Sequence, residues 1–222
     1  MSEIVKSAAL SRQSLSEADL DAINRQALRE LSADEVFAFR LAACNNQLDR
    51  DNERFSDQCL EQLALLFTGK PVLMDHNWSA TTQTARIFAA EVAPMPGVEG
   101  GKQLELKCYM LRSEDTKTAI ANIEGGILRE CSVGCAVEKA TCSICGGSYF
   151  HCNHYKGEEY EGKTCHVILS EAADAYEVSL VAVPAQPGAG VIKAKGAAQK
   201  CWTKQARQQL DMEQVRYGAL RL

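Results

Sequence analysis

The chain has 222 residues, of which 46% are hydrophobic and 24% are charged, and its formal net charge is −5. These values are typical of a soluble globular protein that is large enough for one domain with appendages. Because no apolar run approaches the ~20 residues of a membrane helix, and because no long basic block is present, we expect neither a membrane nor a nucleic acid as partner.

Hydrophobic periodicity predicts a helix near the start of the chain. Ser16-Glu17-Ala18-Asp19 is typical of a helix start, and Leu20, Ile23 and Leu28 are spaced as one apolar face. Further along, we expect strands at 35–45, 71–76, 84–92, 103–111, 127–138, 166–170 and 176–183, and helices at 56–67 and 115–124. We expect a polar loop at 45–53 and a Pro/Gly turn at 94–101.

This order of elements indicates a mainly β protein with flanking helices, an α+β fold, and it fits alternating βαβ units less well. We divide the chain into a helical N-terminal arm (1–34), a central domain (35–195) and a helical C-terminal tail (196–222). A Cys/His/Gly-rich insert at 140–165 interrupts the central domain.

Three strand-like runs each contain a residue that could take part in catalysis. Ser132 faces the side of its strand opposite to its neighbours, and Gly134 removes a side chain from the same side, which leaves room for a peptide. A serine hydroxyl needs a base, and His76 is the best candidate, because the other histidines lie in or beside the cysteine-rich insert. The imidazole needs a carboxylate to orient it, and Glu177 and Glu105 are the two candidates.

Three motifs resemble those of the tailed-phage prohead proteases. Residues 69–76, Gly-Lys-Pro-Val-Leu-Met-Asp-His, are similar to the histidine motif of that family. Residues 129–134 match its serine motif, Arg-x-x-Ser-Ile/Val-Gly, and residues 177–187 match its third motif almost throughout. The motifs occur in family order, and the resemblance covers residues 35–192.

The resemblance implies a fold, an activity and partners. The fold would be a closed or nearly closed antiparallel β-barrel, and the catalytic residues would be Ser132, His76 and Glu177, without a catalytic cofactor. Glu177 takes precedence over Glu105 because the third motif is also similar to a block of the herpesvirus assembly proteases that carries their third catalytic residue. The substrates would be a scaffold protein and the major capsid protein, cut inside the assembling prohead in the host cytoplasm.

The N-terminus, Met1 to Lys6, lacks the basic and apolar pattern of a secretory signal, so we expect no secretion. The sequence is compatible with association into a homo-oligomer and does not give the number of copies.

The insert has the residues of a zinc site. The chain has ten cysteines, and several of them cluster in and near the insert. In a reducing compartment, clustered cysteines indicate metal ligands rather than disulfides. Cys142 and Cys145, followed by a glycine, form a zinc-knuckle pattern, and Cys152 and His154 complete a Cys3His set. We expect a structural zinc, because four protein ligands leave no open position. The substitutes, should this set be wrong, are Cys165, His151 and His166.

Two alternatives come from other functional classes. One is a non-catalytic assembly protein that keeps the protease fold, and the other is a zinc-ribbon module whose insert binds a partner. A serine-directed fluorophosphonate discriminates between them and the enzyme, since only the enzyme would be labelled at Ser132.

Overall fold

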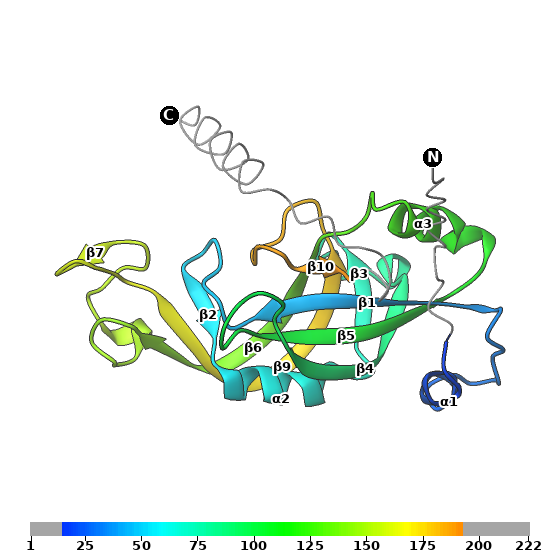
Figure 1. The fold of residues 1–222 in the computed structure, drawn as a ribbon, viewed down its shortest axis with the longest axis horizontal. Coiled ribbons are helices and arrows are strands. Elements are labelled where there is room, and N and C mark those ends of the chain that lie inside the picture. Colours follow the sequence, from blue (N-terminus) through cyan, green and yellow to red (C-terminus); the bar gives the residue numbers. More distant parts are fainter. Residues whose placement is uncertain (1–14, 193–222) are drawn as a thin grey trace, which may run out of the picture. The chain divides into compact units, whose positions relative to one another are not determined.

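The computed structural model describes residues 15–192, and both the start of the N-terminal arm and the predicted tail at 196–222 lie outside them (Figure 1). The helices are α1 (Glu17–Asn24), α2 (Asp57–Phe67) and α3 (Glu114–Glu124), with short 3-10 helices η1 (Ala80–Thr82) and η2 (Tyr149–His151). The strands are β1 (Val36–Asn45), β2 (Glu53–Phe55), β3 (Pro71–Met74), β4 (Ala85–Pro94), β5 (Lys102–Leu111), β6 (Cys131–Cys142), β7 (Glu159–Tyr160), β8 (Lys163–Thr164), β9 (Val167–Leu180) and β10 (Gly190–Val191). The prediction of a mainly β protein with flanking helices is confirmed.

Strand β9 organises the main sheet. The strand order is β10-β1-β5-β4-β3-β9-β2, and β6 pairs with the other edge of β9. The start of β9 runs parallel to β2 and its end runs parallel to β3, whereas β6 is antiparallel to it along its length. The sheet is therefore mixed, and β9 has neighbours on both sides.

The expected barrel was closed or nearly closed, and the closed form is wrong for the described residues, because no sheet among them closes into a barrel. The strand that would have to complete the ring, β10, is only two residues long and pairs with β1. On its other side β10 meets the chain before β6 through one isolated bridge, Glu130 to Gly190. A Cβ atom on Gly190 would lie 2.1 Å from the Arg129 carbonyl oxygen, so only glycine permits even this approach.

Two of the predicted boundaries also need correction. The strands expected at 166–170 and 176–183 form one strand, β9, because β6 provides a continuous partner. Two irregularities in the β6–β9 pairing, at Gly134/Cys135 and Ala136/Val137, accommodate the Ala-rich residues between the two segments. The loop expected at 45–53 ends in β2, a three-residue strand whose partner is distant in the sequence.

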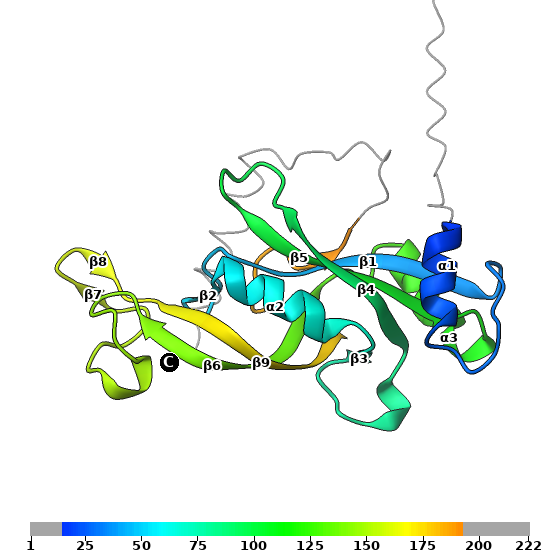
Figure 2. The same cartoon turned by 90° about the horizontal axis from the view of Figure 1, so that it is seen from below.

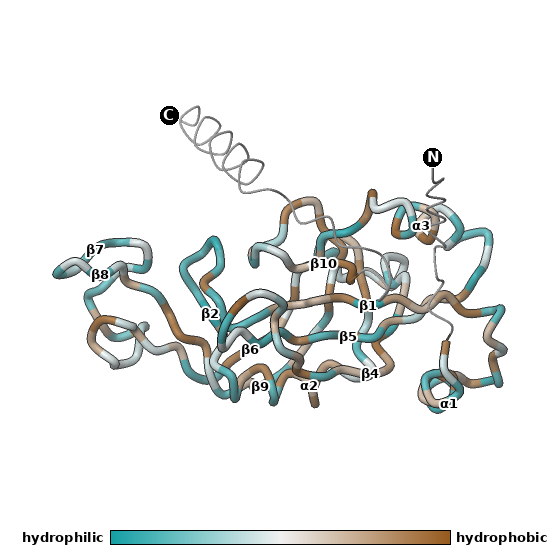
Figure 3. The backbone as a smooth tube through the Cα atoms, viewed as in Figure 1, coloured by the Kyte–Doolittle hydropathy of each residue, from teal (hydrophilic) through white to brown (hydrophobic). Residues whose placement is uncertain are grey.

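Helix α2 covers one side of the sheet and closes the main core. The Ser56 hydroxyl accepts a hydrogen bond from the Cys59 backbone N–H at 3.1 Å, which starts the helix. Helix α2 lies along the sheet and contacts β9, β4 and β5 (Figure 2). Its buried residues recur with helical spacing; they are Cys59, Leu60, Leu63 and Phe67. Figure 3 shows that hydrophobic residues concentrate in these strands and in α2, whereas the segment around β7 and β8 is more hydrophilic.

A smaller apolar cluster holds α1. Ile23 is fully buried and lies in one cluster with Leu31, Val36 and Phe88. The Ser16 hydroxyl caps the helix by accepting from the Asp19 N–H at 3.1 Å. Burial of this apolar face, rather than the length of the helix, is what keeps so short a segment ordered.

Two leucines of α2 provide a test of this packing. Leu63 is fully buried and Leu65 is 83% exposed. Leu63→Ala should lower the free energy of unfolding by about 2–5 kcal/mol, because it leaves a cavity under the sheet. Leu65→Ala should change it by less than ~0.5 kcal/mol. Urea denaturation of both variants measures the difference, and equal losses would contradict the assigned face of α2.

Candidate functional site

The structure brings His76 and Glu177 into direct contact. His76 follows β3 and Glu177 lies near the end of β9, and the parallel pairing of these strands aligns the two residues. The His76 Nδ1 atom is 2.7 Å from Glu177 Oε1. The Glu177 side chain is only 2% exposed, whereas that of His76 is 42% exposed. The carboxylate is thus fixed inside the protein and the imidazole remains accessible from solvent.

The turn that carries His76 has an unusual backbone. Asp75 and His76 have φ angles of +53° and +52°, a region that residues with a Cβ rarely occupy. Two hydrogen bonds to the end of β9 hold the turn. The Asp75 N–H donates to the Leu180 carbonyl at 3.0 Å, and the His76 N–H donates to the Ser179 hydroxyl oxygen at 3.0 Å. These contacts stabilise a conformation that sequence alone would disfavour.

Ser179 connects the turn to the carboxylate. It is fully buried, and its hydroxyl donates to Glu177 Oε2 at 2.6 Å while it accepts from the His76 backbone. Both oxygens of Glu177 therefore have partners, which offsets the cost of burying them. The role of Ser179 was not predicted from the sequence. Its position two residues after Glu177, on the same side of the strand, was the available signal.

Ser132 lies on the same side of the sheet. In the β6–β9 pairing Ser132 is opposite Ser179, and Gly134 is opposite Glu177. A Cβ atom on Gly134 would lie 2.3 Å from Glu177 Oε1, so the carboxylate occupies the space that the glycine leaves free. Within residues 15–192 the half-buried Ser132 side chain forms no hydrogen bond, and so none to His76. The structure joins His76 to Glu177 and places Ser132 on the neighbouring strand, without a Ser132–His76 hydrogen bond.

Glu105, the rival carboxylate, has other partners. Its side chain forms an ion pair with Arg40 and accepts a hydrogen bond from Gln103 Nε2 at 2.8 Å. Glu105 belongs to β5, and the carboxylate that contacts the His76 ring is that of Glu177.

The His76–Glu177 arrangement has a definite chemical capacity. A carboxylate on Nδ1 favours the tautomer with its proton on Nδ1, which leaves the lone pair on Nε2. Nε2 can then take a proton from a hydroxyl and return it to a leaving group. The half-exposed ring and the buried carboxylate together form a unit that can act as a general base.

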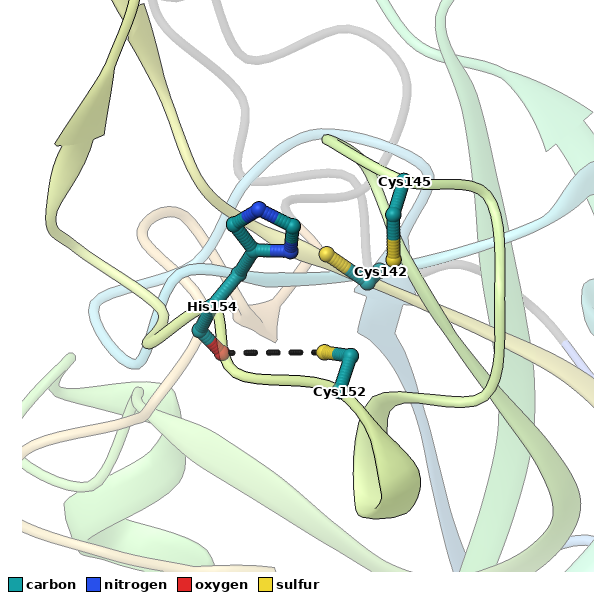
Figure 4. Close-up of side chains that lie close together, drawn as sticks. All are labelled: Cys142, Cys145, Cys152 and His154. Atoms are coloured by element: carbon teal, nitrogen blue, oxygen red, sulfur yellow. Dashed lines mark hydrogen bonds between the residues drawn. The ribbon is translucent and has the colours of Figure 1, made fainter.

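The predicted metal ligands also meet, in the insert between β6 and β9. One potential ligand atom each from Cys142, Cys145, Cys152 and His154 lies within 4.8 Å of all the others (Figure 4). The loop after Cys142 is tight, since the Gly146 N–H donates to the Cys142 carbonyl at 2.9 Å and Gly146 has a φ of +70°. The Ile144 N–H points at the Cys142 sulfur at 3.4 Å.

His154 provides an independent sign that the cluster fits a metal ion. Its Nδ1 atom is buried without a hydrogen-bond partner and points toward the thiols (Figure 4). Buried nitrogen atoms without a hydrogen-bond partner are rare in folded proteins. A metal ion bound by this nitrogen and by the three neighbouring thiolates would provide the partner. The edge of the ring contacts Tyr160, with centroids 4.6 Å apart, which fixes its orientation.

The substitute ligands lie at different distances from this cluster. The Cys165 sulfur is 3.8 Å from that of Cys142 and is fully buried, so a fourth sulfur adjoins the three of the set. The exposed His151 has its Nδ1 at 3.3 Å from the Ser148 hydroxyl. His166 is half-buried and directly precedes β9.

Among the described residues, the Cys142 thiol and the core thiols Cys131 and Cys135 lie in different chemical environments. Burial raises the pKa of Cys142, but hydrogen bonds from the backbone N–H groups of Cys145 and Ile144 outweigh it and lower the pKa to about 6. This favours the thiolate, the form that binds metal. In the core, burial raises the pKa of Cys131 and Cys135 to about 12, and these thiols are chemically inert.

In comparisons with known proteins, no family model matches the chain, and neither the curated proteins nor the solved structures give a match. No helix within residues 15–192 is long and apolar enough to cross a membrane.

Ser179→Ala should lower the free energy of unfolding by about 1–3 kcal/mol, because Glu177 Oε2 and the His76 N–H each lose a buried partner. Ser170→Ala is the matched control on the same strand, since the half-buried Ser170 makes no side-chain hydrogen bond within the described residues. It should change stability by less than ~0.5 kcal/mol. Urea denaturation compares the two, and a neutral Ser179→Ala would show that this network does not hold the turn.

Proposed function

We propose that this protein is a serine endopeptidase. Ser132 is the nucleophile, His76 the general base and acid, and Glu177 the residue that orients His76. The observation that carries the proposal is the 2.7 Å contact between His76 Nδ1 and the buried Glu177, next to the strand of Ser132. The three motifs that resemble those of prohead proteases support the same assignment.

The reaction begins with attack of the Ser132 oxygen on a peptide carbonyl carbon. His76 Nε2 takes the hydroxyl proton as the new C–O bond forms, and Glu177 stabilises the resulting imidazolium. When the C–N bond breaks, His76 returns the proton to the leaving amine. Water then attacks the acyl-enzyme by the same route and releases Ser132. The Ser132–His76 hydrogen bond forms with the substrate, as active-site contacts often tighten only in the complex.

The substrates we propose are a scaffold protein and the major capsid protein of a tailed phage. Support comes from the order and spacing of the three motifs at 69–76, 129–134 and 177–187. In this role the protein acts inside the assembling prohead, where its substrates are concentrated.

We propose a structural zinc for the insert. Its ligands would be Cys142, Cys145, Cys152 and His154, which hold the loops of the insert together. Both Ser132 and Cys142 belong to β6, and ten residues of extended strand separate them by about 30 Å. An ion in the cluster is too far from Ser132 to polarise a substrate there.

A second candidate function is a non-catalytic assembly protein that keeps this fold. The missing Ser132–His76 hydrogen bond is the observation that favours it. The two candidates differ in the reactivity of Ser132, which a fluorophosphonate measures directly.

Fluorophosphonate should label the wild-type protein at Ser132, and Ser132→Ala should abolish both labelling and cleavage of coexpressed scaffold and capsid proteins. His76→Ala should be about as damaging, because members of a triad act as a unit. Intact mass spectrometry gives both readouts, and Ser170→Ala is the control that should process normally. An unlabelled wild type with uncut substrates would favour the non-catalytic protein.

Protein purified without added metal should contain about one zinc per chain. Cys152→Ser should lower this to less than about 0.2, because three ligands hold zinc much less tightly. Cys165→Ser is the matched control, and it should keep its zinc if Cys165 only adjoins the site. Elemental analysis measures both. Zinc retained by Cys152→Ser but lost from Cys165→Ser would assign the third sulfur ligand to Cys165 instead of Cys152.

A further inference from the structure

Two exposed aromatic side chains lie beside the His76–Glu177 pair. Trp78 is 69% exposed and Tyr176 is 39% exposed, and their ring centroids are 5.4 Å apart. Trp78 follows His76 by two residues and Tyr176 immediately precedes Glu177. An exposed tryptophan in contact with a second aromatic ring forms an apolar patch, and such patches on soluble proteins mark binding sites.

The backbone that presents Trp78 is well ordered. The Ser79 N–H donates to the Asn77 carbonyl at 2.8 Å, so a tight turn surrounds the tryptophan. The Thr82 hydroxyl hydrogen bonds to the same carbonyl at 2.5 Å and to that of Ser79 at 2.8 Å. The polar groups of this segment hydrogen bond to one another, and the indole ring is exposed to solvent rather than packed in the core.

An irregularity in the sheet presents Tyr176. Glu177 is opposite Gly134 and Ala175 is opposite Cys135, so Tyr176 has no partner on β6. The extra residue of such a bulge redirects side chains, and here Ala175 and Glu177 are buried while Tyr176 is exposed. The same irregularity therefore sets the position of Glu177 and turns out the ring that contacts Trp78.

We propose that Trp78 and Tyr176 form the apolar wall of a substrate subsite, which accepts an aliphatic or aromatic side chain of a polypeptide close to the scissile bond. This inference rests on the proposed peptidase function and names a feature of its substrate. The occupant is a peptide because the wall lies next in the chain to His76, the proposed general base, and to Glu177, which orients it. Rigid aromatic rings bind apolar side chains at a low cost in conformational entropy.

The test compares wild type with Trp78→Ala and Trp78→Phe, using the full chain and a mixed peptide library read by mass spectrometry. Phe150→Ala is the matched control, because Phe150 is 76% exposed and belongs to the zinc insert. The rate of fluorophosphonate labelling at Ser132 is measured in parallel, since this small probe does not need the wall.

Wild type should prefer an apolar residue at one fixed position beside the cut. Trp78→Ala should lose that preference and about tenfold or more of kcat/KM for such peptides, with labelling within about twofold of wild type. Trp78→Phe should keep most of the preference and most of kcat/KM. Phe150→Ala should change neither the preference nor kcat/KM. If Trp78→Ala is still labelled and its cleavage preference is unchanged, the subsite alone is overturned. That conclusion holds even if sedimentation shows that the variant self-associates differently from wild type. Absence of labelling in wild type would remove the peptidase and the subsite together.

Discussion

The parallel pairing of β3 with the end of β9 is the contact on which the rest of the site depends. It joins segments about a hundred residues apart and places the turn after β3 against Ser179 and Leu180. That turn contains two consecutive residues with left-handed backbone, a conformation that costs on the order of 1 kcal/mol or more per residue. Without the hydrogen bonds to Ser179 and Leu180, the turn would relax and His76 would leave the Glu177 carboxylate.

Local patterns predict the elements of this fold better than their pairing. The capping serine and apolar spacing of α2 are local, and the structure has the helix within a residue of the expected range. Strand β2 was missed because only its partner β9 makes it a strand, and the continuity of β9 depends on β6. The open sheet has the same origin, since the two-residue pairing of β10 with β1 joins segments that are far apart in the sequence.

The two clusters of the chain differ in how sequence encodes them. The insert carries its ligands within a short span, so spacing alone predicts Cys142, Cys145, Cys152 and His154, and these side chains do converge. His76 and Glu177 come together only through the sheet, and family resemblance rather than spacing joined them. Ser179 escaped prediction because a buried serine on a strand looks structural until both of its hydrogen-bond partners are known.

Burial of Glu177 explains why this site needs every one of its contacts. A carboxylate that is 2% exposed cannot rely on water, so each oxygen needs a donor from the protein. The Ser179 hydroxyl satisfies one oxygen, and the His76 Nδ1–H satisfies the other only if the imidazole keeps its proton on that nitrogen. The same burial that requires this tautomer leaves Nε2 free to accept a proton. The folded turn and the prepared base are therefore linked through Ser179, whose hydroxyl accepts from the His76 backbone N–H and donates to Glu177.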